Sequence, residues 1–144
     1  MYYNTRYYNI GFYFSLKHYK VKKFASEAKK SNVSDGLLSN TLKEFLNIGE
    51  DGQKRLSLGS GLYKLRLATQ EGKGKSGGSR GLLAFKKDDR LIWLHLFSKN
   101  DKENITTNEL KKLKSLSDIL LNMPDDDIAK LVKLGEFYEI NNSL

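Results

Sequence analysis

Three segments in the middle of this chain have the apolar pattern of β-strands. In Leu62–Ala68, apolar and basic residues alternate, which is the period of a strand with one buried face and one exposed face. Two apolar runs follow, Gly81–Phe85 and Leu91–Phe97, and the polar residues 86–90 between them are enough for a hairpin turn. Because Leu91–Phe97 is almost entirely apolar, we expect this strand at the centre of a sheet.

Helical spacing of apolar residues precedes these strands. Residues 19–24 form either a short edge strand or the approach to a helix over residues 23–30, which has a weak apolar stripe. Ser34 is a good N-cap for a second helix that ends at Gly49. We expect these two helices to form a hairpin packed on the sheet, and residues 50–61 to be a turn-rich connector without clear periodicity.

A second helical region follows the strands. Thr106 begins it with capping-box spacing, and Pro124 separates it from a further helix that starts with three aspartates and ends at Gly135. Residues 137–140 could add a short terminal strand. Together these patterns predict an α+β fold, with a small antiparallel or mixed sheet, an N-terminal helical hairpin and C-terminal helices.

The composition narrows the class of protein. The 144 residues suit one domain, which we expect over residues 19–144, with residues 1–18 as an aromatic-rich extension that is a poor signal peptide. The absence of cysteine excludes disulfides and thiolate metal sites, and the two isolated histidines argue against a zinc site. No apolar run reaches the roughly 20 residues that span a bilayer. The formal charge of +8 indicates a polyanionic partner.

A glycine-rich basic stretch concentrates this charge. Gly61–Arg80 contains five cations and one acidic residue, which gives a net charge of +4 (5 − 1). In its loop, residues 72–78, glycines let backbone amides approach an anion while Lys73 and Lys75 supply charge. The stretch therefore predicts contact with phosphate groups. It lacks the Gly-x-x-x-x-Gly-Lys-Ser/Thr spacing of a nucleotide-binding loop, which argues against an ATPase.

Several short motifs also occur in a fixed order, within a region from about Lys22 to Ile140. They are Tyr63–Ala68, Gly72–Arg80, Phe97–Asn100, Glu103–Ile105, Glu109–Lys111 and Gly135–Phe137. Taken together, and not singly, they resemble the RelE/HigB-type toxins of bacterial toxin-antitoxin modules. In one departure, this chain has Ser79 before Arg80, where these toxins often have an aromatic residue.

The resemblance implies an activity and a set of partners. Such toxins have a small RNase-like fold, enter the decoding site of a translating ribosome and cut messenger RNA. The ribose 2′-hydroxyl attacks the adjacent phosphate and leaves a 2′,3′-cyclic phosphate and a free 5′-hydroxyl, with no metal or other cofactor. The resemblance further implies a helix-turn-helix antitoxin, contact with DNA only through the antitoxin complex, and a cytoplasmic location.

We expect the cationic strand and loop to carry this chemistry. Arg66 and Arg80 would bind phosphate and stabilise the transition state, because a guanidinium can make two parallel hydrogen bonds to phosphate oxygens. Lys75 is the third catalytic candidate, since a cationic cluster favours the neutral form of a lysine that acts as a base. The expected substrate-binding residues are Lys64, Lys73, Phe97 and Lys99, with Phe97 stacking on a base.

Simpler roles are open for these residues. The loop lysines could be merely solvated, the two arginines could form structural ion pairs, and Phe97 could belong to the core. If Leu91–Phe97 alternates without interruption, one face carries Leu91, Trp93, His95, Phe97 and Lys99. That face would lie beside Lys64 and Arg66. His95 is therefore a candidate base, although a structural role is the commoner one for such a histidine.

Two other functions are compatible with the sequence. One is a non-enzymatic inhibitor of DNA gyrase built on the same scaffold, and the other is a nucleic-acid-binding module without catalysis, which the net charge alone would allow. The basic glycine-rich loop and Arg80 favour the ribonuclease.

Overall fold

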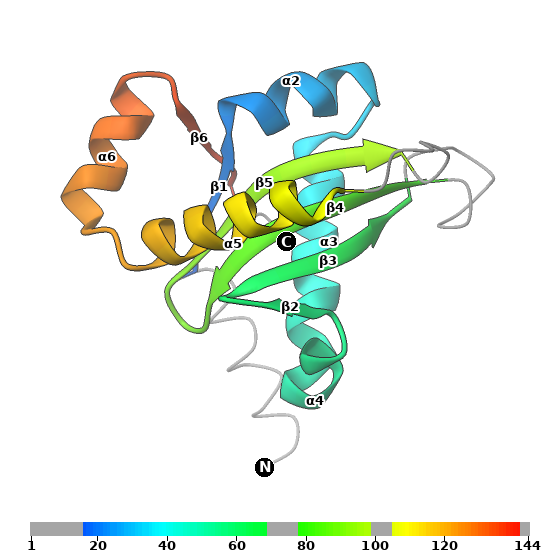
Figure 1. Cartoon of the computed structure of the whole chain (residues 1–144). Helices are drawn as coiled ribbons and strands as arrows, with labels where there is room; N and C mark the ends of the chain where they lie inside the picture. The colour runs from blue at the N-terminus through cyan, green and yellow to red at the C-terminus, as the bar shows by residue number, and fades with distance from the viewer. Residues whose placement is uncertain (1–15, 69–77, 99–104, 142–144) are drawn as a thin grey trace, which may run out of the picture.

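A computed structural model shows an α+β fold in which helices cover both faces of a six-stranded mixed sheet (Figure 1). The structure describes residues 16–68, 78–98 and 105–141. This architecture confirms the predicted fold class. In chain order the elements are β1 (Lys17–Val21), α2 (Lys22–Lys30), α3 (Asp35–Asn47), α4 (Gly49–Lys54), β2 (Ser57–Gly59), β3 (Leu62–Leu67), β4 (Ser79–Lys86), β5 (Arg90–Ser98), α5 (Thr107–Leu121), α6 (Asp125–Lys133) and β6 (Phe137–Glu139).

The strands are ordered β2-β3-β4-β5-β1-β6. β3, β4 and β5 pair antiparallel, as expected for consecutive strands, and β5 lies inside the sheet as predicted. β1 pairs parallel with β5 on one side and antiparallel with β6 on the other. The expectation of an edge strand near residue 19 is therefore wrong, because the C-terminal strand returns to cover the free side of β1.

Hydroxyl side chains cap the N-termini of the two long helices, α3 and α5, as the sequence predicts. The Oγ atom of Ser34 accepts a hydrogen bond from the backbone N–H of Leu37 at 3.1 Å, at the start of α3. The Oγ1 atom of Thr106 accepts one from the N–H of Glu109, also at 3.1 Å, at the start of α5. Each cap satisfies a backbone donor that has no partner within the helix.

Residues 50–61 are more regular than expected. They contain most of α4 and all of β2, where a connector without regular structure was predicted. α4 has only six residues and buries none of them, so no apolar stripe reveals it in the sequence. β2 has three residues, which is too short for a detectable alternation.

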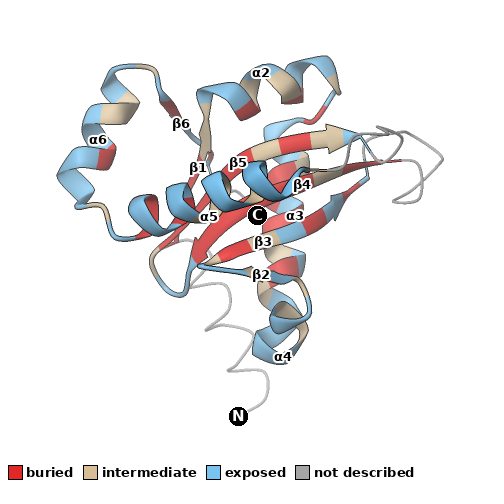
Figure 2. Cartoon of the chain, in the orientation of Figure 1, coloured by how far each residue is buried: buried red, intermediate tan, exposed pale blue. Residues whose placement is uncertain are grey.

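Each face of the sheet has its own core, and Figure 2 shows buried residues concentrated in the strands. On one face, residues of α2 and α3 such as Phe24 and Leu38 pack with Leu65. On the other face, residues of α5 and α6 such as Leu120 and Ile128 pack with Leu62. The α5 face is covered only along part of β3, because Lys64 and Arg66 are exposed on it.

A β-bulge in β5 changes which residues share a face. Leu83 of β4 pairs with Trp93, but Leu82, the residue before it, pairs with His95. Leu94 is therefore the extra residue of β5. Trp93 consequently packs on the α3 face, whereas Phe97 packs on the α5 face. The predicted uninterrupted alternation from Leu91 to Phe97 is wrong.

The described fold begins three residues before the expected boundary at residue 19. Leu16 is part of the core under α3, and β1 starts at Lys17. His18 is also buried, and its Nε2 atom accepts a hydrogen bond of 2.8 Å from the indole Nε1–H of Trp93. The hydrogen bond ties the first strand to the centre of the sheet.

Candidate functional site

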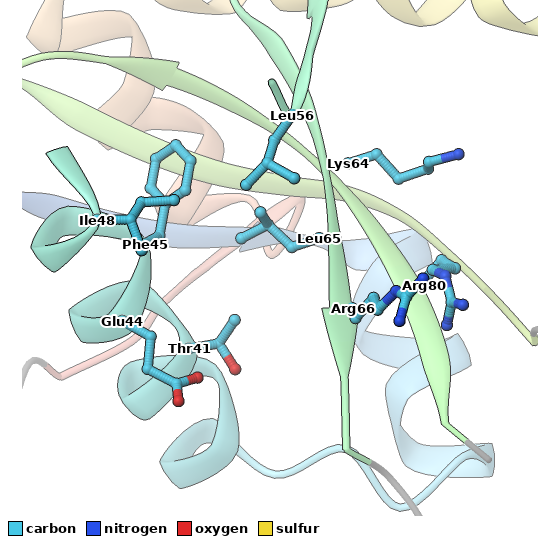
Figure 3. Close-up of a pocket in the computed structure, with 9 residues that line it drawn as sticks. All are labelled: Thr41, Glu44, Phe45, Ile48, Leu56, Lys64, Leu65, Arg66 and Arg80. Carbon is cyan, nitrogen blue, oxygen red and sulfur yellow. The ribbon is translucent and has the colours of Figure 1, made fainter. Parts of the chain in front are cut away.

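A row of three side chains crosses β3, β4 and β5 on the α5 face of the sheet. Arg66 pairs with Arg80, and Arg80 pairs with Phe97. Lys64 lies two residues before Arg66 and so projects from the same face. Figure 3 shows Lys64, Arg66 and Arg80 directed away from α3. The bulge is necessary for this row, because an uninterrupted strand would place Phe97 on the opposite face.

The Arg80 guanidinium has an unsatisfied donor. Its Nη1 atom is buried and has no hydrogen-bond partner among the residues that the structure describes. Partial burial, and then the charge of Arg66, lower the pKa of Arg80 below its usual value. A buried donor without a partner and a like charge nearby both cost free energy. An anion placed between the two guanidinium groups would remove both costs.

Protein carboxylates do not neutralise these cations within residues 16–68, 78–98 and 105–141. In that part of the chain, ion pairs involve other basic residues, for example Lys17, Lys87 and Arg90, and none includes Lys64, Arg66 or Arg80. The alternative that Arg66 and Arg80 serve as structural ion pairs is thus without support there. In the described part of the chain nothing offsets their positive charge, which suits an external anion.

Phe97 lies between the two positions considered from the sequence, a core residue and an exposed platform for stacking. It is half-buried against the core under α5, and its ring stacks on His95 with ring centroids 5.8 Å apart and an interplanar angle of 26°. The His95 side chain is 14% exposed. One side of the Phe97 ring is therefore supported by another ring, which is a suitable backing for an aromatic platform.

A carboxylate on α2 fixes the strand on which these rings lie. β1 pairs with β5 only from Arg90 to Trp93, and the chain then turns into α2 beside the remaining edge of β5. There, Glu27 Oε1 accepts a hydrogen bond of 3.3 Å from the N–H of Leu96 and lies 3.8 Å from His95 Nδ1. Burial lowers the pKa of His95 from 6.5, a shift that Glu27 opposes.

Four of the seven predicted site residues lie together on the described face: Lys64, Arg66, Arg80 and Phe97. Lys73, Lys75 and Lys99 lie outside the described residues, and their assignments stay predictions. Ser79 is buried and, one residue before Arg80, belongs to the opposite face of β4. A side chain at position 79 is therefore not directed toward the cationic row.

Sequence reasoning did not find a groove beside this row. It has a volume of about 520 Å³ and runs between α3 and β3 (Figure 3). The only sequence signal for this groove was the helical periodicity of α3. That periodicity identifies the helix face that packs on the sheet, but not the side chains at the edge of that face, which line the groove. The groove is lined by Thr41, Glu44, Phe45, Ile48, Leu56, Lys64, Leu65, Arg66 and Arg80.

The described part of the chain has neither a metal-binding cluster nor a membrane-spanning helix. Residues 16–68, 78–98 and 105–141 contain no group of three or more histidine, aspartate or glutamate side chains arranged to hold a metal ion. Among the helices of those residues, none has the length and apolar character that crossing a membrane requires.

Comparison with known proteins assigns the chain to a family. Among curated proteins, none matches this sequence. A family model described as the RelE toxin of the RelE/RelB toxin-antitoxin system matches residues 16–140, which include the whole sheet and all of the described helices. This chain is a member of the RelE toxin family.

Proposed function

We propose that this protein is the toxin of a toxin-antitoxin module and that it inhibits translation by cutting ribosome-bound messenger RNA. The observation that carries the proposal is the buried Nη1 atom of Arg80, which has no partner among the described residues and lies next to Arg66 and in line with Phe97. A phosphodiester flanked by a base fits this arrangement, because it offers anionic oxygens to the guanidinium groups and a flat ring to Phe97.

The proposed reaction is transfer of the phosphate to the neighbouring ribose 2′-oxygen. The 2′-hydroxyl loses its proton to a base and attacks phosphorus, the bond to the 5′-oxygen breaks, and that oxygen receives a proton. Arg66 and Arg80 stabilise the phosphorane, whose extra negative charge develops where their donors point. The proposal needs no metal, since the guanidinium groups supply the positive charge.

The base and the acid come from the cationic side chains around the phosphate. Lys64 is on the open face beside Arg66, and Lys75 is the candidate that the sequence places in the glycine-rich loop. His95 lies behind Phe97, and its lowered pKa keeps the ring neutral near pH 7. We assign to His95 the role of supporting the Phe97 ring.

The partners follow from family membership and charge. A RelB-type antitoxin is the expected protein partner, and the net charge of +8 suits binding to RNA in the ribosome. Action on translating ribosomes places the protein in the cytoplasm.

A reconstituted translation reaction tests this function. Purified protein is incubated with an mRNA that is either free or bound in the decoding site of purified ribosomes, and the 5′ ends of the products are mapped. The proposal predicts cleavage of the bound mRNA, with 2′,3′-cyclic phosphate ends on the upstream products and free 5′-hydroxyl ends on the downstream products. Growth arrest in cells without mRNA cleavage in either sample would overturn it, and inhibition of purified gyrase would then identify the alternative.

A further inference from the structure

The C-terminal half of β3 lies at an open edge of the sheet. β2 pairs with β3 at Leu62 and Tyr63, and this pairing ends where the N–H of Lys64 donates to the carbonyl oxygen of Leu56 at 3.0 Å. Because the amides of a strand point alternately to its two sides, the N–H of Arg66 points to the same side as that of Lys64. No described strand lies beside β3 at this point, so the peptide groups of Arg66 face the open edge.

The groove beside α3 passes over this edge. Leu65 lines it from the α3 face of the sheet, where it belongs to the same core as Phe45. Lys64 and Arg66 line it from the other face, on the opposite side of the β3 ribbon (Figure 3). One groove can reach both faces of a sheet only across a free edge. The edge of β3 is therefore accessible from the groove.

The two sides of β3 present different chemistry to the groove. On the α3 side the walls include Ile48 and Leu56, and Ile48 is 49% exposed although most other large apolar residues of the described chain are buried. Glu44 also lines this side, where it already has an interaction within the protein. On the other side Lys64 and Arg66 are exposed and form no ion pair with a described carboxylate. The edge thus combines an apolar side with a positively charged side.

An extended polypeptide strand matches this combination. Successive side chains of a strand point to opposite faces of the sheet, so a strand added beside β3 would place every second side chain against Ile48 and Leu56. The side chains between them would lie beside Lys64 and Arg66. The backbone of the added strand would bond to the free N–H and C=O of Arg66, as in other cases of strand addition. The segment that fits has alternating apolar and acidic residues.

Other occupants match this edge less well. A second copy of the chain that paired through β3 would bring Lys64 and Arg66 of the two copies together, and like charges on paired strands destabilise a sheet. Basic side chains beside an open edge also disfavour pairing with neutral strands, so they select an acidic one. RNA would bind the cations, but it has neither peptide groups for the edge nor aliphatic side chains for the α3 side.

We propose that the open edge of β3 binds an extended acidic segment of a partner protein. The segment adds to the sheet as a strand, with its apolar residues toward α3 and its acidic residues toward Lys64 and Arg66. The inference goes beyond the proposed function, because the ligand is a polypeptide whose binding is measured without RNA. A bound segment would also cover Arg66 and so control access to the cationic row.

Synthetic peptides test the match of side chains. The probe is a peptide of about ten residues, the upper length of an ordinary strand, in which valine and glutamate alternate. One control has the same composition with the valines and glutamates in two blocks, and the other alternates valine and lysine. In fluorescence anisotropy with the full-length protein, the alternating acidic peptide should bind roughly tenfold or more tightly than either control. Equal affinities of the two acidic peptides would overturn strand addition, because charge alone would then explain binding.

Hydrogen exchange tests where the peptide binds. The Arg66 amide should exchange more slowly in the presence of the alternating acidic peptide, because strand pairing protects it. The Lys64 amide, which already donates to Leu56, should change little. Peptide binding without added protection of the Arg66 amide would place the peptide elsewhere and overturn the proposal.

Two variants test the two sides of the groove. In Lys64→Glu, the preference should move toward the valine–lysine peptide. Ile48→Asp should weaken binding of the acidic peptide by roughly tenfold or more, because it places a carboxylate in the apolar wall. Ile119→Asp adds the same charge at a similarly exposed position of α5, outside the groove, and should leave the affinity unchanged. Wild-type affinity in Ile48→Asp, or equal losses in both aspartate variants, would contradict the proposed site.

The possible results separate this inference from the proposed function. Specific peptide binding by a protein that cuts no mRNA would support the strand site and overturn the endonuclease. Cleavage of ribosome-bound mRNA by a protein that binds none of the peptides would do the reverse. Protection of the Arg66 amide by an RNA oligonucleotide and not by the acidic peptide would assign the edge to RNA and overturn the proposal.

Discussion

Arg66 and Arg80 lie opposite each other on neighbouring antiparallel strands, with both side chains on the open part of the α5 face. Opposite positions on paired strands bring side chains close, and like charges there destabilise a sheet. The fold therefore keeps two cations at a position where they repel each other, and no described carboxylate compensates them. An anion bound between the two guanidinium groups would relieve this repulsion.

Inorganic phosphate should stabilise the folded protein. An anion bound between Arg66 and Arg80 favours the folded state by mass action, so the thermal unfolding midpoint should rise with phosphate concentration. The rise should be absent in Arg66→Gln and present in Lys133→Gln, which removes an exposed cation from α6. Equal stabilisation of all three proteins would show that phosphate acts through general screening and not through this pair.

Arg90 should be the cation on which stability depends most. The residue is 4% exposed, and its Nη1 atom donates to the carbonyl oxygens of Leu120 and Met123 at 2.9 and 2.7 Å. Its Nη2 and Nε atoms donate to Asp125 and Asp89. These bonds hold the end of α5 and the start of α6 against β5. Arg90→Met should lower the free energy of unfolding by about 3–5 kcal/mol, as measured by urea denaturation.

Lys17→Met is the matched control for Arg90. Lys17 also binds Asp125, at 2.9 Å, but its side chain is 42% exposed. Its removal should change the free energy of unfolding by less than about 1 kcal/mol. Similar losses in Lys17→Met and Arg90→Met would mean that Asp125, and not the buried guanidinium network, is what secures α6.

His95 should make stability depend on pH in the acid range. Burial lowers its pKa below 6.5, Lys23 lowers it further, and Glu27 and Glu109 oppose the shift. Well above pH 6.5 the ring is neutral in both states. As the pH falls, the unfolded chain binds a proton first, and stability is lost until the pH passes the folded pKa. In His95→Asn, the thermal unfolding midpoint should change less between about pH 7 and pH 5 than it does in the wild type.

NMR titration of the histidine rings measures the same effect directly. The His95 signal, assigned by its loss in His95→Asn, should titrate below 6.5. Glu27→Gln should lower its pKa further, because the carboxylate favours the charged ring. A His95 pKa at or above 6.5 in the wild type would contradict the burial of this ring behind Phe97.

Phe97 should contribute to RNA binding through its ring. Phe97→Leu keeps an apolar side chain against the α5 core but removes the surface on which a base can stack. Stacking on an aromatic side chain is worth about 1–3 kcal/mol, so cleavage at low RNA concentration should fall roughly tenfold or more. Phe97→Tyr retains the ring and should restore most of the activity; a Tyr variant as poor as the Leu variant would indicate a packing role instead.

Local patterns allowed much of this fold to be predicted. The alternation in Leu62–Leu67, the polar turn before Arg90 and the hydroxyl caps at Ser34 and Thr106 each depend on a few neighbouring residues. Lys64, Arg66 and Arg80 became candidates in the same way, because the charge of one short stretch is visible without knowledge of the fold. Family resemblance added the expected chemistry of these residues.

The features that were missed depend on contacts between distant segments. The bulge at Leu94 exists only in relation to β4, and it reverses the face on which Phe97 lies. The interior position of β1 depends on β6, which follows more than a hundred residues later. Glu27 and Glu44 acquire their positions from helix packing against β5 and β3, so neither differs in sequence from an ordinary helical carboxylate.

Cleavage of ribosome-bound mRNA by Arg80→Ala tests the proposed activity most directly. Loss of a charge-assisted contact that strengthens in the transition state costs about 3 kcal/mol, so the cleavage rate should fall on the order of a hundredfold. The melting temperature and antitoxin binding should stay close to those of the wild type, because the Arg80 guanidinium has no described partner to lose. Cleavage by a folded Arg80→Ala at the wild-type rate would contradict the assignment of Arg80 to the reacting phosphate.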